Sequence, residues 1–466
     1  MQVHVSPSSR VPDHCRPYAL SYKGDPDYVA TCNHEHDLRC DRCDLLSNVV
    51  SEIESALDNV ETSSDDKEEM KYVVSLAKKR IDSWKAHLLR SINQDEARLD
   101  VLKDLDACSA LVVFDWAMKY LPRKYRESQT DWFGKRGISW HITTAMRKSE
   151  GQLQMLSFVH IFQSCNQNSI TVLAIIDDAL KQLKTTMPEV KRVHLRQDNA
   201  GCYHSASTLL AIQLVANKYN INVRMDFSDP QGGKGSCDRK AATIKNHMRL
   251  YLNSGQDVET ADQMKNAIES SGGVPGVRAM LCDSQGITYT SSAPVKWDGV
   301  SFINNIEYGD EGIRVWRSYA VGPGKFLPWS QFNLPETYSL PELNTLKEAN
   351  IPKAQFTAIT SRRKSSLTQQ GEKQMTVSLA EDSDEQSDDD KQCYDKLFSC
   401  PEEGCIRSFQ RFSSLQRHLD VGRHSYVLEI ETLVDKAMMS YVTKLEEGIA
   451  SEIGRASCRE RVYVLV

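Results

Sequence analysis

Three aspartates are placed where an α/β chain could bring carboxylates to one site. Asp198 follows the stretch 190–197, which has the pattern of a short strand. Asp238 comes one strand–helix unit later, at the start of a helical pattern with one apolar face. Asp115 closes the run 110–114, a short apolar stretch typical of a buried strand. These three are the candidate catalytic residues of the chain.

Three clustered carboxylates support metal-ion chemistry. Mg²⁺ and Mn²⁺ prefer oxygen ligands, and two such ions ~3.5–4 Å apart can stabilise the attacking and leaving oxygens of a phosphodiester displacement. Without metal, the three side chains would repel one another. The third position stays open, because Asp226, Asp229 and Glu259 compete with Asp238 for it. Each of these acids could instead cap a strand or lie on the surface.

A second type of chemistry is indicated near the start of the chain by closely spaced cysteines and histidines. Zn²⁺ takes four tetrahedral nitrogen or sulfur ligands, and Cys40-x-x-Cys43 is a typical half-site. Cys32, His34 or His36 would supply the remaining ligands. Cys15 is an outside candidate, and a polar loop with reduced thiols is the alternative.

The most specific motif lies near the other end. The spacing Cys400-x4-Cys405-x12-His418-x5-His424 predicts a Cys-Cys-His-His zinc finger. A ββα unit of this size folds because zinc supplies about 10–16 kcal/mol. One finger reads ~3 bp, which is too few to select a genomic site alone. The partner of the finger therefore stays open between DNA, RNA and a protein. The apolar residues expected in its core are Phe398, Phe409 and Leu415. The polar residues expected on the helix that would contact nucleic acid are Ser413, Gln416 and Arg417.

The elements that must position the three aspartates follow from hydrophobic periodicity. Strands alternate every second residue or form short apolar runs, whereas amphipathic helices repeat every three to four residues. The predicted order is strand, strand, strand, helix, strand, helix, strand, helix, over residues 110–114, 138–145, 155–162, 170–183, 190–197, 209–215, 221–227 and 237–251. This order predicts an α/β fold with a mixed sheet and flanking helices.

Three phrases in this region resemble a known group of proteins. They are Phe114-Asp-Trp-Ala-Met-Lys, Arg196-Gln-Asp-Asn-Ala-Gly-Cys-Tyr-His204 and Gly233-Lys-Gly-Ser-Cys-Asp-Arg-Lys240. Over about residues 85–330 the chain resembles the RNase H-like DDE/DDD transposases and integrases, in particular a transposon-derived group that often carries a zinc finger. The resemblance implies that Asp115, Asp198 and Asp238 bind two divalent cations, Mg²⁺ or Mn²⁺, and that DNA strands are cut or transferred.

The same resemblance implies DNA as a partner, with protein partners and oligomers also open. Domesticated members often lose activity, so a second hypothesis is a non-enzymatic zinc-finger adaptor in which the RNase H-like core is a scaffold. The predicted plan begins with a zinc-binding cluster and helix (1–62), a helical segment (63–105) and the RNase H-like core (106–290). A β-rich extension forming a small separate sheet (291–340) and an acidic disordered linker (341–395) follow. The chain then continues with the finger (396–426), a helix (427–452) and a terminal stretch (453–466). The last stretch, from Ile453, resembles a translated sequencing adapter.

Composition narrows the function classes. The net charge of −6 over 466 residues argues against a general nucleic-acid binder, but the block 381–391 alone holds seven carboxylates and one lysine. Basic stretches at 119–126 and 234–249 can still face DNA phosphates. The thirteen cysteines are not arranged as a secreted disulfide framework, and the sequence has no apolar run long enough to cross a membrane. We expect an intracellular, nuclear protein.

Overall fold

The computed structural model describes residues 5–128, 131, 135–229, 235–285, 287, 296–332, 340–350 and 355–359, and two short strands at 398–399 and 408–409. The chain divides into two compact units, Met1–Ser365 and Ser366–Val466. Among the described helices, none combines the length and apolar character needed to span a bilayer.

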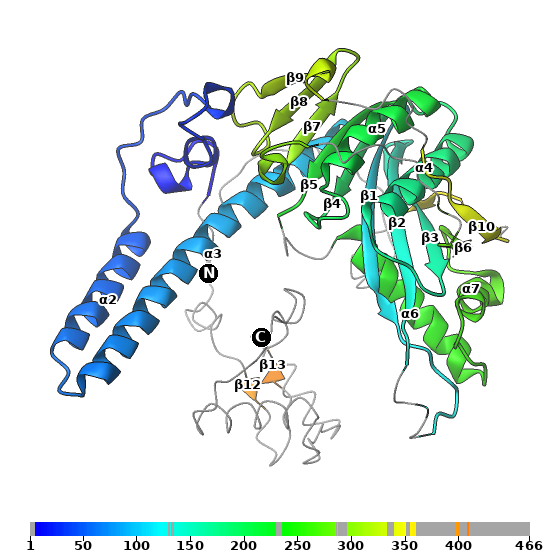
Figure 1. The fold of residues 1–466 in the computed structure, drawn as a ribbon, viewed down its shortest axis with the longest axis horizontal. Helices are drawn as coiled ribbons and strands as arrows, with labels where there is room; N and C mark the ends of the chain where they lie inside the picture. Colours follow the sequence, from blue (N-terminus) through cyan, green and yellow to red (C-terminus); the bar gives the residue numbers. More distant parts are fainter. Residues whose placement is uncertain are drawn as a thin grey trace, which may run out of the picture. The chain divides into compact units, whose positions relative to one another are not determined.

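Five strands form the centre of the first unit, in the spatial order β3-β2-β1-β4-β5 (Figure 1). The strands β1, β2 and β3 are antiparallel neighbours, whereas β4 runs parallel to β1 and β5 runs parallel to β4. Their bounds are Ser109–Tyr120, Ile138–Ser149, Gln152–Phe162, Arg192–Gln197 and Asn222–Phe227. The turn between β2 and β3 uses Glu150 and Gly151, both with positive φ (52° and 75°), as tight hairpins require.

Helices cover both faces of this sheet. Those on one face are α4 (Ser169–Thr186) and α5 (Ala206–Tyr219), and those on the other are α6 (Ser236–Asn253) and α7 (Ala261–Glu269). Successive strand residues point to opposite faces, so Phe158 packs with α4 and α5 while Val159 packs with α6 and α7. The chain order of elements predicted from periodicity is confirmed, and the mixed sheet with flanking helices is consistent with an RNase H-like fold.

The β-rich extension differs from the prediction of a small separate sheet. Its first strand, β7, pairs antiparallel with β5, so the extension continues the central sheet. The physical reason is that β5 would otherwise expose an unpaired edge. On the opposite edge, β6 runs parallel to β3, and two short strands that fall inside the predicted linker also join the sheet. The bounds of β6 to β11 are Val277–Asp283, Asn305–Tyr308, Gly312–Trp316, Lys325–Pro328, Asn344–Lys347 and Thr357–Ala358.

Before the sheet, two helices form an antiparallel hairpin: α2 (Asp41–Asp58) lies along the first part of α3 (Ser64–Asp104), joined by ion pairs such as Lys71 with Asp58 (Figure 1). The later part of α3 packs on the core, where Gln94 Nε2 donates to the Phe227 carbonyl at 2.6 Å. Short helical turns are η1, α1, η2, η4, η5 and η6, at Pro12–His14, Arg16–Ala19, Pro26–Tyr28, Ser270–Gly272, Val300–Phe302 and Trp329–Gln331.

In the second unit the structure describes one antiparallel strand pair, β12 (Phe398–Ser399) with β13 (Ser408–Phe409). The pair flanks Cys400 and Cys405 in the sequence, as the hairpin of a ββα finger would. The finger ligands Cys400, Cys405, His418 and His424 lie outside the described residues, as do the predicted helix 427–452 and the stretch 453–466.

Candidate functional site

Asp115 lies within the central strand of the sheet. The sequence predicted that it closes a short strand, but β1 continues for five more residues to Tyr120. The strand is longer because β2 pairs with it beyond Asp115, which lies opposite Ile142. At Asp115 the strand β1 is therefore paired with β2, whereas its pairing with β4 ends two residues earlier, at Val113.

Asp198 reaches the same level of the sheet from the next strand. The strand β4 ends at Gln197, and its residue Arg196 lies opposite Val113 of β1. Because the two strands are parallel, a further step of two residues on each brings Asp198 beside Asp115. Asp198 is exposed, and its Oδ1 accepts a hydrogen bond from the Ala200 backbone at 3.2 Å.

Asp238 is supplied by the first turn of α6. The helix start is held on the sheet by the Cys237 thiol, which donates to the Val113 carbonyl at 3.3 Å, and by Ser236, whose hydroxyl lies 2.6 Å from that of Thr144. The Asp238 Oδ2 accepts a hydrogen bond from the Gly235 backbone at 2.9 Å. This carboxylate therefore also caps its own helix.

The electrostatics of Asp115 connect the three acids. Burial is the largest cause that raises the pKa of Asp115, from its usual 3.8 to about 7, and the carboxylates of Asp198 and then Asp238 raise it further. The three side chains thus lie in one electrostatic neighbourhood. In the described part of the chain their oxygens do not all come within 4.8 Å of one another, since the two groups that meet that spacing are of cysteine and histidine.

A cavity of about 360 Å³ opens beside Asp115. Asp115 and Asp238 both line it, as do Arg239, which follows Asp238 directly, and Lys245, further along α6. Asp198 is not part of this lining. The cavity therefore combines two carboxylates with two cationic side chains, a combination suited to a metal ion and a phosphate group.

The acids that competed for the third position have other partners. Asp226 is buried, and its Oδ1 accepts from Asn305 at 2.6 Å and from Arg224 at 3.2 Å. Asp229 lies 2.7 Å from His87 of α3. Glu259 lies 3.6 Å from the Lys124 amino group. None of these three lines the cavity, so within the described residues Asp238 is the acid that shares it with Asp115.

Sequence reasoning missed a buried polar network behind Asp115. The Tyr203 hydroxyl lies 2.9 Å from His141 Nε2, and His160, opposite His141 on β3, lies 2.9 Å from Asp178. Burial raises the pKa of Tyr203 well above its usual value, and the charge that adds most to the rise is that of Asp115. The signal in the sequence is weak, because two histidines on separate strands become neighbours only through strand pairing.

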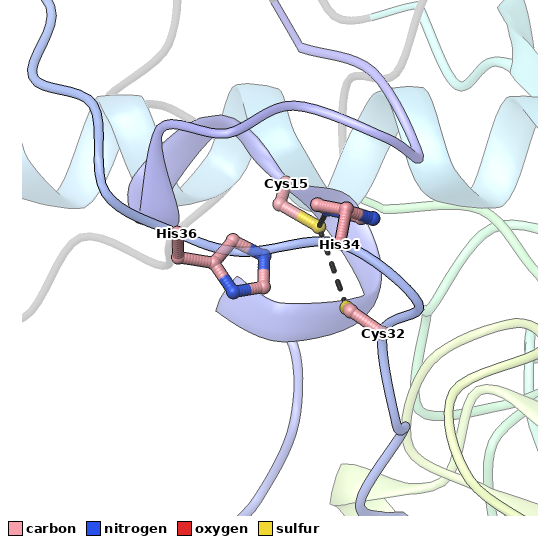
Figure 2. A group of neighbouring side chains, drawn as sticks. All are labelled: Cys15, Cys32, His34 and His36. Atoms are coloured by element: carbon pink, nitrogen blue, oxygen red, sulfur yellow. Dashed lines mark hydrogen bonds between the residues drawn. The ribbon is translucent and has the colours of Figure 1, made fainter.

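At the N-terminus the structure brings four potential zinc ligands together. In Cys15, Cys32, His34 and His36, one ligand atom of each residue lies within 4.8 Å of the others (Figure 2). The Cys15 sulfur lies 3.7 Å from that of Cys32 and 3.4 Å from His34 Nε2. This is a two-cysteine, two-histidine set, as structural zinc sites have.

The pair Cys40 and Cys43 belongs to a different group. Its third member is His14, whose Nε2 lies 3.4 Å from the Cys43 sulfur. The sequence grouped Cys40 and Cys43 with Cys32, His34 or His36, and the structure does not bring these sets together. Cys15, an outside candidate, lies inside the first group, and His14 was not predicted.

Part of this chain is similar to known proteins. Residues 94–295 match the model of a family described as a domain of unknown function, DUF8701. No curated protein sequence matches this chain. A solved structure of the human cytomegalovirus terminase nuclease domain, manganese-soaked and inhibitor-bound, has 10% identity and a TM-score of 0.19; the match covers 34% of this chain and 65%, less than two thirds, of that one.

Two structures of the Mos1 transposase are also similar. The paired-end complex with the left transposon end has 13% identity and a TM-score of 0.24, covering 52% of this chain and 74% of that one. The pre-cleavage transpososome has 10% identity and a TM-score of 0.22, covering 51% and 73%.

Proposed function

We propose that this chain is a DNA-binding, zinc-binding protein of transposase ancestry, whose core cleaves or transfers DNA strands with divalent metal ions. The observation that carries the proposal is the position of Asp115: it lies half-buried within the central strand, and its pKa is raised by loss of solvation and by the carboxylates of Asp198 and Asp238. An isolated strand-end aspartate would not have this environment. Perturbed carboxylates beside a cavity are typical of functional sites.

Asp115, Asp198 and Asp238 would hold the ions, Mg²⁺ or Mn²⁺. The donor set fits, because carboxylate oxygens are the ligands that these ions prefer. Bound ions would polarise the phosphodiester and activate the attacking oxygen. The chain itself supplies the rest: Arg239 and Lys245 would orient a backbone phosphate at the cavity.

DNA is the substrate we propose, and the nucleus the location. The exposed cations Arg123 and Arg126 follow β1 and extend the basic surface available to a phosphate backbone. The predicted finger would add a second contact to nucleic acid. Protein partners and oligomers are compatible with these features.

One observation favours the alternative, a non-enzymatic zinc-finger adaptor with an RNase H-like scaffold. Asp238 already caps α6 through Gly235, and Asp198 does not line the cavity. In that case the three aspartates would have structural roles alone.

A nicking and strand-transfer assay on plasmid DNA, with Mg²⁺ or Mn²⁺, separates the two. We expect metal-dependent nicking that is lost in Asp115→Asn and Asp198→Asn. The matched control is Asp283→Asn, which changes an aspartate at the end of β6, on another part of the sheet. An inactive wild-type protein, or activity that survives in Asp198→Asn, would support the adaptor.

A further inference from the structure

The seven ligand residues of the N-terminus form two groups, one nested inside the other along the chain. Those of the group in Figure 2 are Cys15, Cys32, His34 and His36, and those of the other are His14, Cys40 and Cys43. The second group thus encloses the first in the sequence, because His14 comes directly before it and Cys40 and Cys43 come after it. Neighbouring residues, His14 and Cys15, contribute to different groups.

A single ion cannot bind both groups. Zinc lies ~2.0–2.3 Å from nitrogen and sulfur ligands, so two ligands of one ion lie at most about 4.6 Å apart. Each group comes close to this limit, since its ligand atoms are all within 4.8 Å of one another, but no larger combined set in the described residues does. The arrangement therefore has two centres.

In the group of Cys15, Cys32, His34 and His36, which forms the first centre, one ring nitrogen has no hydrogen-bond partner among the described residues. This nitrogen is His36 Nε2, which is buried. A buried ring nitrogen without a partner is costly unless something binds it. The His36 ring also packs between other rings, 4.8 Å from that of His34 and 4.1 Å from that of Tyr18, which holds its orientation.

Apolar packing does not explain how this segment folds. In residues 5–43, all of which are described, the buried side chains are those of Cys15 and Tyr28. The segment contains short helical turns and no disulfide links its cysteines. A chain with so small a core requires a metal or cross-link to keep one structure.

We propose that residues 5–43 form a nested two-zinc module. The first ion has a closed set of two cysteines and two histidines. The second is held by His14, Cys40 and Cys43, and no fourth Cys, His, Asp or Glu of the described residues joins that group. The second ion ties the two ends of the segment together around the first.

The module also fixes the part of the chain that docks on the sheet. Between Cys15 and Cys32, Tyr28 enters the main core, and the Asp27 carbonyl accepts from the Gly324 backbone at 2.9 Å. A Cβ at Gly322, where φ is +79°, would lie 2.6 Å from that same carbonyl. The turn after β8 and the zinc module thus meet backbone to backbone.

Cobalt titration counts the centres without altering them. The full chain carrying Cys400→Ser and Cys405→Ser, which remove the predicted finger, is depleted of metal and titrated with Co²⁺. Thiolate-to-cobalt absorption reports sulfur-bound ions and ignores the carboxylate site. We expect an end point of two equivalents per chain; an end point of one or none overturns the proposal.

Zinc analysis of variants then assigns the ligands. In the same background, Cys32→Ser should lower the zinc content by one ion per chain, Cys40→Ser by one, and the double variant by two. Cys108→Ser, a half-exposed cysteine outside both groups, is the matched control and should change nothing. His14→Ala should remove one ion while its neighbour Asp13→Ala does not; retention of both ions in His14→Ala would refute the assignment of His14 to the second centre.

Discussion

Asp115→Asn replaces a carboxyl by an amide of nearly the same size and removes one negative charge from the cavity beside β1. Folding raises the pKa of Asp115 from 3.8 to about 7. Each pKa unit corresponds to ~1.4 kcal/mol, so the folded state opposes ionisation of the Asp115 carboxyl by about 4 kcal/mol. Because the site is partly accessible to water, that value is an upper bound.

The sign of the pH dependence follows from linkage. Between about pH 4 and 7 the folded protein binds a proton on Asp115 that the unfolded chain has released. The stabilising contribution of this group is therefore complete below pH 3.8 and is lost as the pH rises to about 7. The variant Asp115→Asn has no carboxyl to ionise at this position, so its stability does not fall in this way as the pH rises. We expect it to exceed the wild type in stability by ~2–4 kcal/mol at pH 8 in a chelator, and to match it at pH 4.

Divalent ions should reverse the order of stability of the wild type and Asp115→Asn. Binding to the folded state stabilises by about 2.7 kcal/mol at a hundred times the dissociation constant. The wild type should gain this stability with Mg²⁺ or Mn²⁺, whereas Asp115→Asn, which lacks one ligand, should gain little. Urea unfolding between pH 4 and 9, with chelator or with metal, measures both effects. The result that refutes the reasoning is a variant less stable than the wild type at pH 8 in chelator, or a metal response equal in both proteins.

Three further outcomes are expected. Asp238→Ala removes the hydrogen bond that caps α6 at Gly235 and should lower the free energy of unfolding by about 0.5–1 kcal/mol in urea; an unchanged value would contradict the capping role. Asp229→Ala leaves His87 of α3 without its carboxylate, so stability should fall by about 1–3 kcal/mol and amide exchange in the later part of α3 should quicken; protection equal to the wild type would argue against this anchor. Cys405→Ser should lower the zinc content by one ion per chain, and an unchanged content would exclude the predicted finger.

Local pattern was sufficient for most of the secondary structure. The strands at 138–145 and 155–162, and the helices at 170–183 and 237–251, were predictable because their hydrophobic periodicity depends on neighbouring residues. The same locality placed Asp198 after β4 and Asp238 in the first turn of α6.

Tertiary structure decided which strands pair and which side chains lie close together. No local signal shows that β7 pairs with β5, that Asp115 lies inside its strand, or that Tyr203 meets His141, because these contacts link residues far apart in the sequence. The zinc ligands show the same limit: spacing identified the cysteines and histidines, but their division between two centres depends on how the chain folds back on itself. Chemical type and local periodicity are properties of the sequence, whereas pairing and proximity come from long-range packing.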